Sequence, residues 1–382
     1  MSGIPPWDIY NQMKDAMKPE SEAELSEMVR AARGALSLRG GGTRGVAFGA
    51  GESLETSGLT GIRLYEPGAL TLVVGAGTSV AEVEAVLTAE RQRLAFEVPD
   101  MRAVLGRQGV STIGGMAATN ASGPRRVQAG AARDHMLGVR FVDGMGTVVK
   151  SGGRVMKNVT GLDLVKLLAG SHGTLGVLSE VAFKVQAVPE AEVSLCARVG
   201  VTEGLAMLRK ALGSPFEVSG AAYGSFGALL WVEGMEASVR YRVGALQALL
   251  GGDWAEVAGK ALWAGVRDGG GVGAGALWRV SVKPTGAERV VAVLQGVEHE
   301  ATFDWGGGLI WIAVRGLADG GAALIRSAVA GVGHATLIRG PQGVPVFQPE
   351  AAGVAALSRA LRAKFDPRGI LNAGIFDLGD GG

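Results

Sequence analysis

A fifteen-residue stretch without an ionisable side chain, Gly109–Gly123, is the feature that most constrains this chain. It holds four glycines and four hydroxyl side chains, and it is followed by a second glycine-spaced turn, Gly170–Gly176. Glycine allows the main chain to approach a ligand closely and to adopt positive φ, and exposed backbone N–H groups bind phosphate oxygens. The stretch therefore predicts one wall of a ligand site, with a diphosphate-bearing cofactor as the first hypothesis.

The composition limits the class of protein. With 382 residues, 47% of them hydrophobic, the chain is long enough for two domains with buried cores. Lys and Arg total 37 against 36 acidic residues, so no strong field favours nucleic acid or an anionic membrane surface. The single cysteine, Cys196, excludes an internal disulfide and any all-cysteine zinc or iron–sulfur site within the chain.

The sequence gives no sign of membrane insertion. Met1–Lys18 lacks a long apolar core behind a basic start, and uncharged runs such as Val218–Val232 stop at 15 residues and are broken by glycine. We therefore expect a cytoplasmic protein with neither a signal peptide nor a spanning helix.

Hydrophobic periodicity and turn residues predict a mixture of helices and strands. A helix is expected within Pro19–Gly34, where Ser21 and Glu24 have capping-box spacing. The other expected elements are strands at Ala35–Leu38, Ile62–Tyr65, Leu70–Val74, Val177–Val185, Leu277–Val282 and Leu309–Val314, a hairpin of Gly138–Val142 and Thr147–Lys150, and helices at Ser79–Thr88, at Leu162–Ala169 and before Asp366.

Two segments imitate a dinucleotide-binding fingerprint. Gly40–Gly45 fits the glycine spacing, but no helix is expected after it to receive a pyrophosphate. Gly75–Val80 lies between a strand and a helix, but Val80 replaces the third glycine, at which strand and helix must pack closely. A nicotinamide Rossmann site is therefore disfavoured.

Six motifs follow one another in a fixed order: Arg39–Thr43, Ser111–Gly123, Arg133-Asp134, Asn158–Leu164, Gly170–Glu180 and Phe365–Asn372. Each glycine turn alone is typical of an ordinary turn. In this order the set resembles the FAD-binding family of the vanillyl-alcohol oxidase and p-cresol methylhydroxylase type. Further segments are similar to the FAD-binding second subunit of heteromeric bacterial glycolate oxidases (glycolate dehydrogenases), namely Arg125-Arg126, Val155–Asn158, Leu277–Ser281, Asp304–Gly307 and Gly333–Thr336.

The resemblance implies an α+β fold. A two-subdomain FAD-binding domain is expected at residues 1–188, divided into about 1–96 and 97–188, and a smaller cap domain with an antiparallel sheet and helices at 189–345, on the substrate side. The C-terminal segment, 346–382, is expected to return to the FAD-binding domain.

The same resemblance implies the residues that bind the cofactor. Arg39–Arg44 would hold the pyrophosphate, Thr112–Gly123 would follow the pyrophosphate, ribityl chain and isoalloxazine ring, and Pro99 would lie at the flavin edge. Gly176 and Val177 would offer main-chain contacts on the adenine side, and Asn372 would return at the ring end. The complete predicted set is Arg39, Gly40, Gly41, Gly42, Thr43, Arg44, Pro99, Ser111, Thr112, Gly114, Gly115, Ala118, Thr119, Asn120, Ser122, Gly123, Gly176, Val177 and Asn372.

The chain departs from the family pattern at two positions. Leu162 stands where an aromatic residue is usual, and His172 where Glu is usual, so only a backbone role carries over at either place. No histidine or cysteine lies in Arg39–Arg44, where relatives with covalent flavin often attach the ring. We therefore expect noncovalent FAD.

Oxidation of a 2-hydroxy acid requires a cation for the carboxylate, a base for the hydroxyl proton and a hydride acceptor. Arg279, on an alternating strand, could hold the carboxylate or form an interdomain salt bridge. His334 could face the flavin or support a tight turn. Relatives that oxidise such acids alone carry two histidines one residue apart in the second domain; here His299 and His334 are 35 residues apart, and no metal site is predicted.

By the resemblance, the complex also contains a second FAD-binding catalytic subunit and an iron–sulfur subunit that passes electrons towards quinone, and any membrane association is through that complex. The expected function is oxidation of glycolate to glyoxylate, or relay of its electrons through FAD to the iron–sulfur partner. Two alternatives stay open: a structural partner subunit with a non-catalytic flavin, and a free-standing FAD oxidase of another small hydroxy acid or alcohol.

Overall fold

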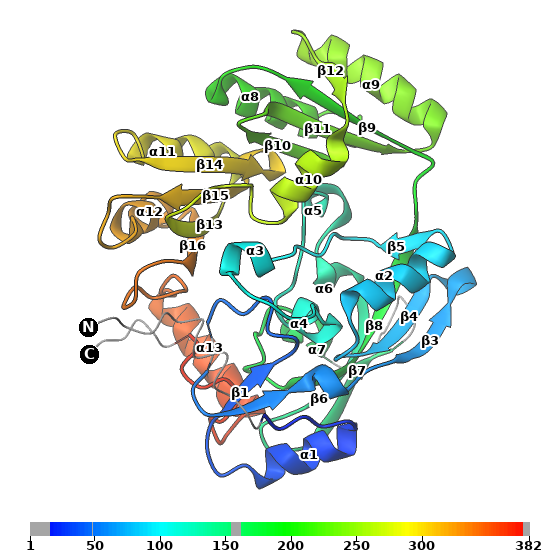
Figure 1. Ribbon diagram of the computed structural model, residues 1–382, viewed down its shortest axis with the longest axis vertical. Helices are drawn as coiled ribbons and strands as arrows, with labels where there is room; N and C mark the ends of the chain where they lie inside the picture. Colours follow the sequence, from blue (N-terminus) through cyan, green and yellow to red (C-terminus); the bar gives the residue numbers. More distant parts are fainter. Residues whose placement is uncertain (1–15, 48, 154–161, 377–382) are drawn as a thin grey trace. The chain divides into compact units, whose positions relative to one another are not determined.

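The computed structural model describes residues 16–47, 49–153 and 162–376 (Figure 1). The chain divides into two compact units. The first comprises the described parts of Met1–Ala121, Ala131–Ala187 and Pro349–Gly382, and the second comprises Ser122–Gly130 and Val188–Gln348. Ser122–Gly130, which the sequence placed in the FAD-binding half, therefore groups with the second unit.

The first unit begins with helix α1 (Glu22–Ala31), whose N-terminus is capped as predicted, since the Ser21 hydroxyl accepts from the Glu24 N–H at 3.2 Å. Leu25 and Val29 of α1 pack in a small core with β1 (Leu36–Arg39) and β2 (Glu52–Glu55), which pair in parallel. Strand β2 was not expected from the sequence, because Glu-Ser-Leu-Glu is short and three of its four residues are polar. Leu36 also bridges Leu371, so the C-terminal segment lies beside β1.

The larger sheet of this unit has the order β3-β4-β8-β6-β7, with β5 (Gln92–Leu94) paired to β8. Its strands are β3 (Ile62–Glu66), β4 (Thr71–Gly75), β6 (Met136–Val142), β7 (Val148–Gly152) and β8 (Val177–Ala187), and every pairing is antiparallel. The predicted strands and the β6–β7 hairpin are confirmed. Because β4 is antiparallel to both neighbours, the strand–turn–helix that leads into α2 (Val80–Ala89) is not a parallel Rossmann unit.

The uncharged stretch contains a short helix that was not predicted. After α3 (Arg102–Leu105), helix α4 (Ile113–Ala118) is capped by Thr112, whose hydroxyl accepts from the Gly115 N–H at 3.4 Å. The Gly114 N–H donates to the Ala76 carbonyl at 2.7 Å, in the turn after β4. A Cβ on Gly114 would lie 2.9 Å from the Ala76 Cβ, so glycine allows this close packing.

The remaining elements of the first unit are short helices between the sheet strands and one long helix near the C-terminus. They are α6 (Ala132–His135), α7 (Leu164–Leu168) and α13 (Ala352–Phe365). The helices predicted at Leu162–Ala169 and before Asp366 are confirmed, with α7 beginning two residues later than expected.

The second unit is built on one eight-stranded antiparallel sheet with the order β12-β9-β11-β10-β14-β15-β13-β16. Its strands are β9 (Ala191–Ala197), β10 (Gly220–Gly224), β11 (Gly227–Gly234), β12 (Ala255–Val257), β13 (Ala276–Val282), β14 (His299–Asp304), β15 (Leu309–Val314) and β16 (Gly333–Arg339). Its helices are α5 (Arg126–Ala129), α8 (Val201–Leu212), α9 (Glu236–Leu250), α10 (Gly259–Arg267), α11 (Ala287–Val293) and α12 (Ala322–Val329). The antiparallel sheet and the strands at Leu277–Val282 and Leu309–Val314 are confirmed.

Alternate residues of β13 and β15 face opposite sides of this sheet. Val280, Ile310 and Ile312 belong to the core cluster that also contains residues of α8, α9 and α12, whereas Arg279 and Trp311 lie on the other side. Across the described ranges, no helix combines the length and the apolar composition that crossing a bilayer requires.

Candidate functional site

The first unit contains a pocket where β1, α4 and the Gly170–Gly176 turn come together. It contains about 770 Å³ of space not occupied by protein atoms, which includes open solvent at its mouth. The predicted cofactor residues that line it are Arg39, Gly40, Gly41, Gly42, Thr43, Arg44, Thr112, Gly114, Gly115, Ala118, Thr119, Gly176, Val177 and Asn372. The structure therefore brings together residues that are separated by more than 300 positions in the sequence.

The glycine loop after β1 lies directly against the wall formed by the uncharged stretch. A Cβ on Gly40 would be 2.2 Å from the Thr112 Oγ1, and one on Gly41 would be 1.6 Å from the Val110 carbonyl oxygen. Any side chain at these positions would push the loop away from α4. These two glycines are thus needed to bring the loop and the wall into contact, which forms one side of the pocket.

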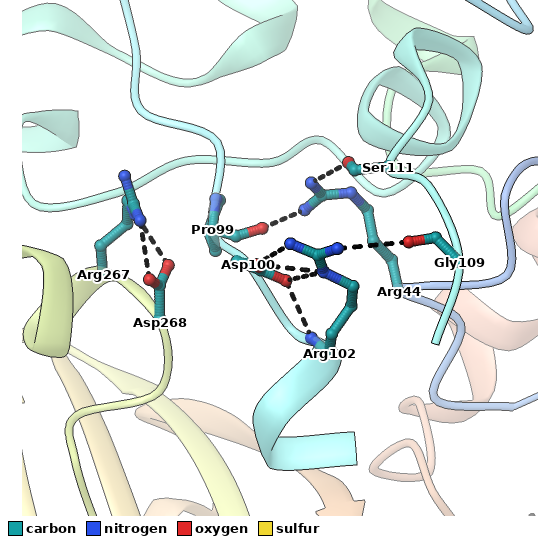
Figure 2. A network of polar contacts seen from close by, with 8 residues as sticks. All are labelled: Arg44, Pro99, Asp100, Arg102, Gly109, Ser111, Arg267 and Asp268. Carbon is teal, nitrogen blue, oxygen red and sulfur yellow. Dashed lines mark hydrogen bonds and ion pairs between the residues drawn. The ribbon is translucent and has the colours of Figure 1, made fainter. Parts of the chain in front are cut away.

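Arg44 at the end of this loop is fixed by two residues of the other predicted segments. Figure 2 shows its guanidinium between the Pro99 carbonyl, which accepts at 2.7 Å, and the Ser111 hydroxyl, which accepts at 2.6 Å. Pro99 and Ser111 are not among the residues that line the pocket, and their contact with the cofactor stays a prediction. In the structure they hold a pocket arginine, and Arg39 and Arg44 together give the pocket a positive edge that suits a diphosphate.

Beside this arginine, Asp100 and Arg102 form a second contact network (Figure 2). The Arg102 guanidinium donates to both carboxylate oxygens of Asp100, at 2.9 Å to Oδ1 and 2.6 Å to Oδ2. Hydrogen bonds from Arg102, with smaller contributions from the charges of Arg102 and Arg44, lower the pKa of Asp100. The carboxylate therefore stays ionised and balances part of the positive charge at the end of the loop.

Asn372 connects the C-terminal segment to two walls of the pocket. Its Oδ1 accepts from the Leu38 N–H at 2.7 Å, and its Nδ2 donates to the His172 carbonyl at 2.7 Å. The residue is buried and has a φ of +47°, a conformation that asparagine tolerates better than most residues. Its amide thus holds β1 and the glycine turn at a fixed separation.

His172 lines the pocket although the sequence gave it no side-chain role. Its φ is +52°, and its ring meets Phe376 edge-on at a centroid distance of 5.7 Å. Desolvation by burial lowers the pKa of His172 to about 4, so the imidazole is neutral near pH 7. The replacement of Glu by His noted in the sequence therefore puts an uncharged polar ring at the pocket where a carboxylate would be usual.

Three other predicted cofactor residues lie outside the pocket lining. Asn120 accepts from the Arg133 N–H at 3.0 Å through its Oδ1, inside the first unit. Ser122 and Gly123 belong to the second unit, where the Ser122 hydroxyl accepts from Arg126 at 2.9 Å and the Gly123 carbonyl accepts from Trp305 Nε1 at 3.0 Å. Within the described residues, these side-chain and backbone groups serve protein contacts.

The two candidate catalytic residues lie on one face of the second-unit sheet. Arg279 and Ser281 alternate with core residues of β13, and His334 of β16 pairs directly with Ser281. Residues directly opposed in an antiparallel pair project to the same face, so Arg279 and His334 are diagonal neighbours. The structure thus supports a shared location for the two predicted residues.

Positive charge accumulates at this face. The guanidinium groups of Arg279 and Arg126 lie 5.5 and 5.0 Å from the ring centroid of Trp305. Burial, with a further effect of the Arg126 charge, lowers the pKa of Arg279 to about 10. Burial and the nearby cations also lower the pKa of His334, so its imidazole is biased towards the neutral form that can accept a proton.

Comparison with known proteins gives the family. Residues 15–152 match the FAD binding domain family. The chain is 34% identical to the glycolate oxidase subunit GlcE of Escherichia coli over 329 residues, which cover 85% of this chain and 87% of that protein. The chain belongs to the family of this glycolate oxidase subunit. The predicted family, the FAD cofactor and the class of FAD-dependent oxidoreductase are thereby confirmed.

Members of other flavoprotein groups match over shorter stretches or in fold alone. The glycolate oxidase subunit GlcD of Bacillus subtilis is 39% identical over 88 residues, 23% of this chain and 19% of that protein. The structure of 4-ethylphenol oxidase from Gulosibacter chungangensis superposes with a TM-score of 0.69 at 12% identity, covering 94% of this chain and 88% of that one. An alkyldihydroxyacetonephosphate synthase superposes with a TM-score of 0.67 at 16% identity, covering 93% and 76%. These neighbours agree with the predicted α+β fold.

Two of the segments on which the resemblance was based fall largely outside the described residues. These are most of Asn158–Leu164 and all of Val155–Asn158. Leu162, which is described, is 84% exposed. In the described parts of this family member, no three His, Cys, Asp or Glu side chains gather as metal ligands would.

Proposed function

We propose that this chain is the FAD-binding subunit of a complex that oxidises glycolate to glyoxylate, or relays its electrons through FAD to an iron–sulfur partner. The pocket in the first unit is the observation that supports this proposal, together with membership of a glycolate oxidase subunit family. The proposed partners are a second flavin-binding catalytic subunit and an iron–sulfur subunit. A second relative, GlcD of Bacillus subtilis, is also named as a glycolate oxidase subunit.

The residues of the pocket fit a noncovalent diphosphate cofactor. A Cβ on Gly115 would meet only the Thr112 hydroxyl, at 3.3 Å, so this glycine is not required by neighbouring protein atoms in the way that Gly41 is. The bare backbone of Gly115 leaves room for a ligand against α4. No cysteine or histidine lies in Arg39–Arg44, which favours binding without a covalent bond.

FAD, when bound, supplies a two-electron acceptor for the hydride of an alcohol carbon. The chain's own residues bind it: Arg39 and Arg44 are proposed to contact the diphosphate, and α4 and the Gly170–Gly176 turn to support the rest of the cofactor. Asn372 holds the two sides of the pocket at their separation.

Arg279 and His334 are proposed to act on the substrate. The Arg279 guanidinium would bind the carboxylate of a small 2-hydroxy acid, because it is half-buried and positively charged. His334 would accept the hydroxyl proton at a ring nitrogen, for which its lowered pKa is suitable.

Purification of the chain by itself tests the proposal. We expect a flavin absorbance spectrum, and acid precipitation should release the yellow FAD into the supernatant. Bleaching by glycolate would support oxidation at this flavin, whereas a flavin that dithionite bleaches but glycolate does not would support electron relay or a non-catalytic flavin. FAD missing from both the isolated chain and the complex would refute the proposal.

A further inference from the structure

The sheet face that carries Arg279 also contains a buried donor whose acceptor is missing. The indole Nε1–H of Trp311 is buried and has no hydrogen-bond partner among the described residues, and only 3% of the residue is exposed. Other buried tryptophans of this unit are satisfied: Trp263 donates to the Ser194 hydroxyl at 3.0 Å and Trp278 to the Gly320 carbonyl at 2.8 Å. An unmet buried N–H is uncommon and costs stability unless a ligand or water accepts from it.

Arg279, on the same face, is half-buried and lacks a protein acceptor among the described residues. In the part of the chain that the structure describes, its guanidinium makes no hydrogen bond to protein and no ion pair within 4 Å. It lies over the Trp305 ring and interacts electrostatically with Arg126, Asp304 and His334. Asp304 is buried and accepts from the Trp305 N–H at 2.7 Å. Its charge offsets part of the positive charge without hydrogen-bonding Arg279.

The strand register brings these two donors together. Arg279 of β13 is directly opposite Trp311 of β15. Directly opposed residues project to the same face, with Cβ atoms about 4.5–5.5 Å apart. Trp311 is also opposite Thr302 of β14, and a Cβ on Gly270 would be 3.0 Å from the Trp311 Cβ, so the loop after α10 lies close to the base of this side chain.

We infer that Trp311 is a substrate-binding residue whose indole N–H, together with the Arg279 guanidinium, donates to the carboxylate of a small 2-hydroxy acid. A carboxylate has two oxygens that accept hydrogen bonds and a negative charge, and it therefore satisfies a neutral donor and an unpaired cation at once. An amide or alcohol of the same size can accept hydrogen bonds but does not balance the charge of the guanidinium. The identity of the ligand rests on the proposed function. The positions of the two donors come from the structure alone.

Binding of acetate and acetamide to the flavin-loaded chain tests the inference, because these two molecules have nearly the same shape and differ in charge. We expect acetate to raise the thermal midpoint and acetamide to have little effect. Trp311→Phe, which removes the N–H and keeps an aromatic ring, should weaken acetate binding roughly tenfold. Trp263→Phe is the matched control: it breaks an existing hydrogen bond and should lower the thermal midpoint while acetate affinity stays as in the wild type.

A double-mutant cycle of Trp311→Phe and Arg279→Met measures the coupling between the two residues in acetate binding. A role of Trp311 in packing alone would not change this coupling. If both donors bind the same carboxylate, Trp311→Phe should have a much smaller effect on acetate affinity when Arg279→Met is already present. Acetate affinity unchanged by Trp311→Phe, or a full effect of that variant in the Arg279→Met background, would overturn the inference. FAD content is measured on the same samples. This measurement distinguishes loss of the cofactor, which would contradict the proposed function, from loss of the carboxylate site.

Discussion

The side chain of Asn372 donates from Nδ2 to the carbonyl oxygen of His172 at 2.7 Å, linking two segments that lie 200 residues apart in the chain. Its Oδ1 accepts from Leu38 in β1. The side-chain amide of Asn372, near the C-terminus, therefore links two walls of the pocket. This arrangement leads to the first of four predictions.

Asn372→Ala should destabilise the FAD-free protein by on the order of 2 kcal/mol, because two part-buried backbone groups lose their partners. FAD should also bind more weakly, since β1 and the glycine turn lose their link. Urea unfolding of the apoprotein and titration with FAD measure the two effects. Asn372→Asp, which keeps the acceptor for Leu38 and loses the donor to His172, should be intermediate; an apoprotein as stable as the wild type in both variants would contradict the prediction.

His172 predicts a pH dependence of the free energy of unfolding. Its pKa is about 4 in the folded protein against 6.5 ordinarily, so between these values the unfolded chain binds a proton that the folded chain does not. This contribution is fully present above pH 6.5, is lost progressively as the pH falls, and stops changing below about pH 4. The difference between the two pKa values corresponds to at most about 3–4 kcal/mol of the free energy of unfolding.

His172→Asn provides the comparison, since asparagine tolerates the positive φ and does not titrate here. Unfolding of the apoproteins between pH 7 and pH 4 should show a steeper loss of stability in the wild type than in the variant. Parallel curves would show that His172 is solvated when protonated.

Gly115→Val should lower FAD occupancy by occupying space against α4. Gly115→Ala is the sharper variant, because its Cβ meets only the Thr112 hydroxyl at 3.3 Å and alanine favours helix by about 1 kcal/mol. The apoprotein should therefore keep or gain thermal stability while its flavin-to-protein ratio falls. Gly41→Ala is the contrast, since its Cβ would clash with the Val110 carbonyl and should destabilise the loop itself. Normal flavin content in both Gly115 variants would mean that this part of α4 does not face the cofactor.

Removing the charge of Arg125 and removing that of Arg279, both in the second unit, should have different effects on the stability of the protein. Arg125 donates to Glu233 at 2.8 Å in a buried ion pair, so Arg125→Met should cost about 3–5 kcal/mol. Arg279 has no such partner among the described residues, so Arg279→Met should leave the thermal midpoint unchanged or raise it, while the KM for glycolate rises if this chain oxidises it. Thermal unfolding of the two variants compares them directly, and a large stability loss in Arg279→Met would indicate a structural role.

The sequence was sufficient to predict an element where its local pattern agrees with the tertiary structure. The alternation in Val177–Val185 and the cap at Ser21 predicted β8 and α1, because each pattern points to one period or one terminus. Helix α4 was missed because Ile-Gly-Gly-Met-Ala-Ala has little intrinsic helix preference, and hydrogen bonds to the turn after β4 support it.

The site was predicted in outline and not in its contacts. Glycine spacing identified the loop and the wall, but the roles of Pro99 and Ser111 depend on where the Arg44 side chain reaches, which no spacing encodes. Trp311 gave no signal at all in the sequence, because its significance comes from an unmet donor and from a cross-strand neighbour on another strand.

The nine residues Ser122–Gly130 leave the first unit and return to it, and the Ala132 N–H donates to the Ala121 carbonyl at 3.0 Å across the base of the loop. Their Arg125 neutralises Glu233 inside the second unit. The second unit is therefore not a contiguous stretch of the gene: a fragment cut at Val188 and Gln348 would carry a buried carboxylate without its counter-ion. Exchange of this unit between relatives would have to carry Ser122–Gly130 along, so this loop and the eight-stranded sheet are expected to be inherited together.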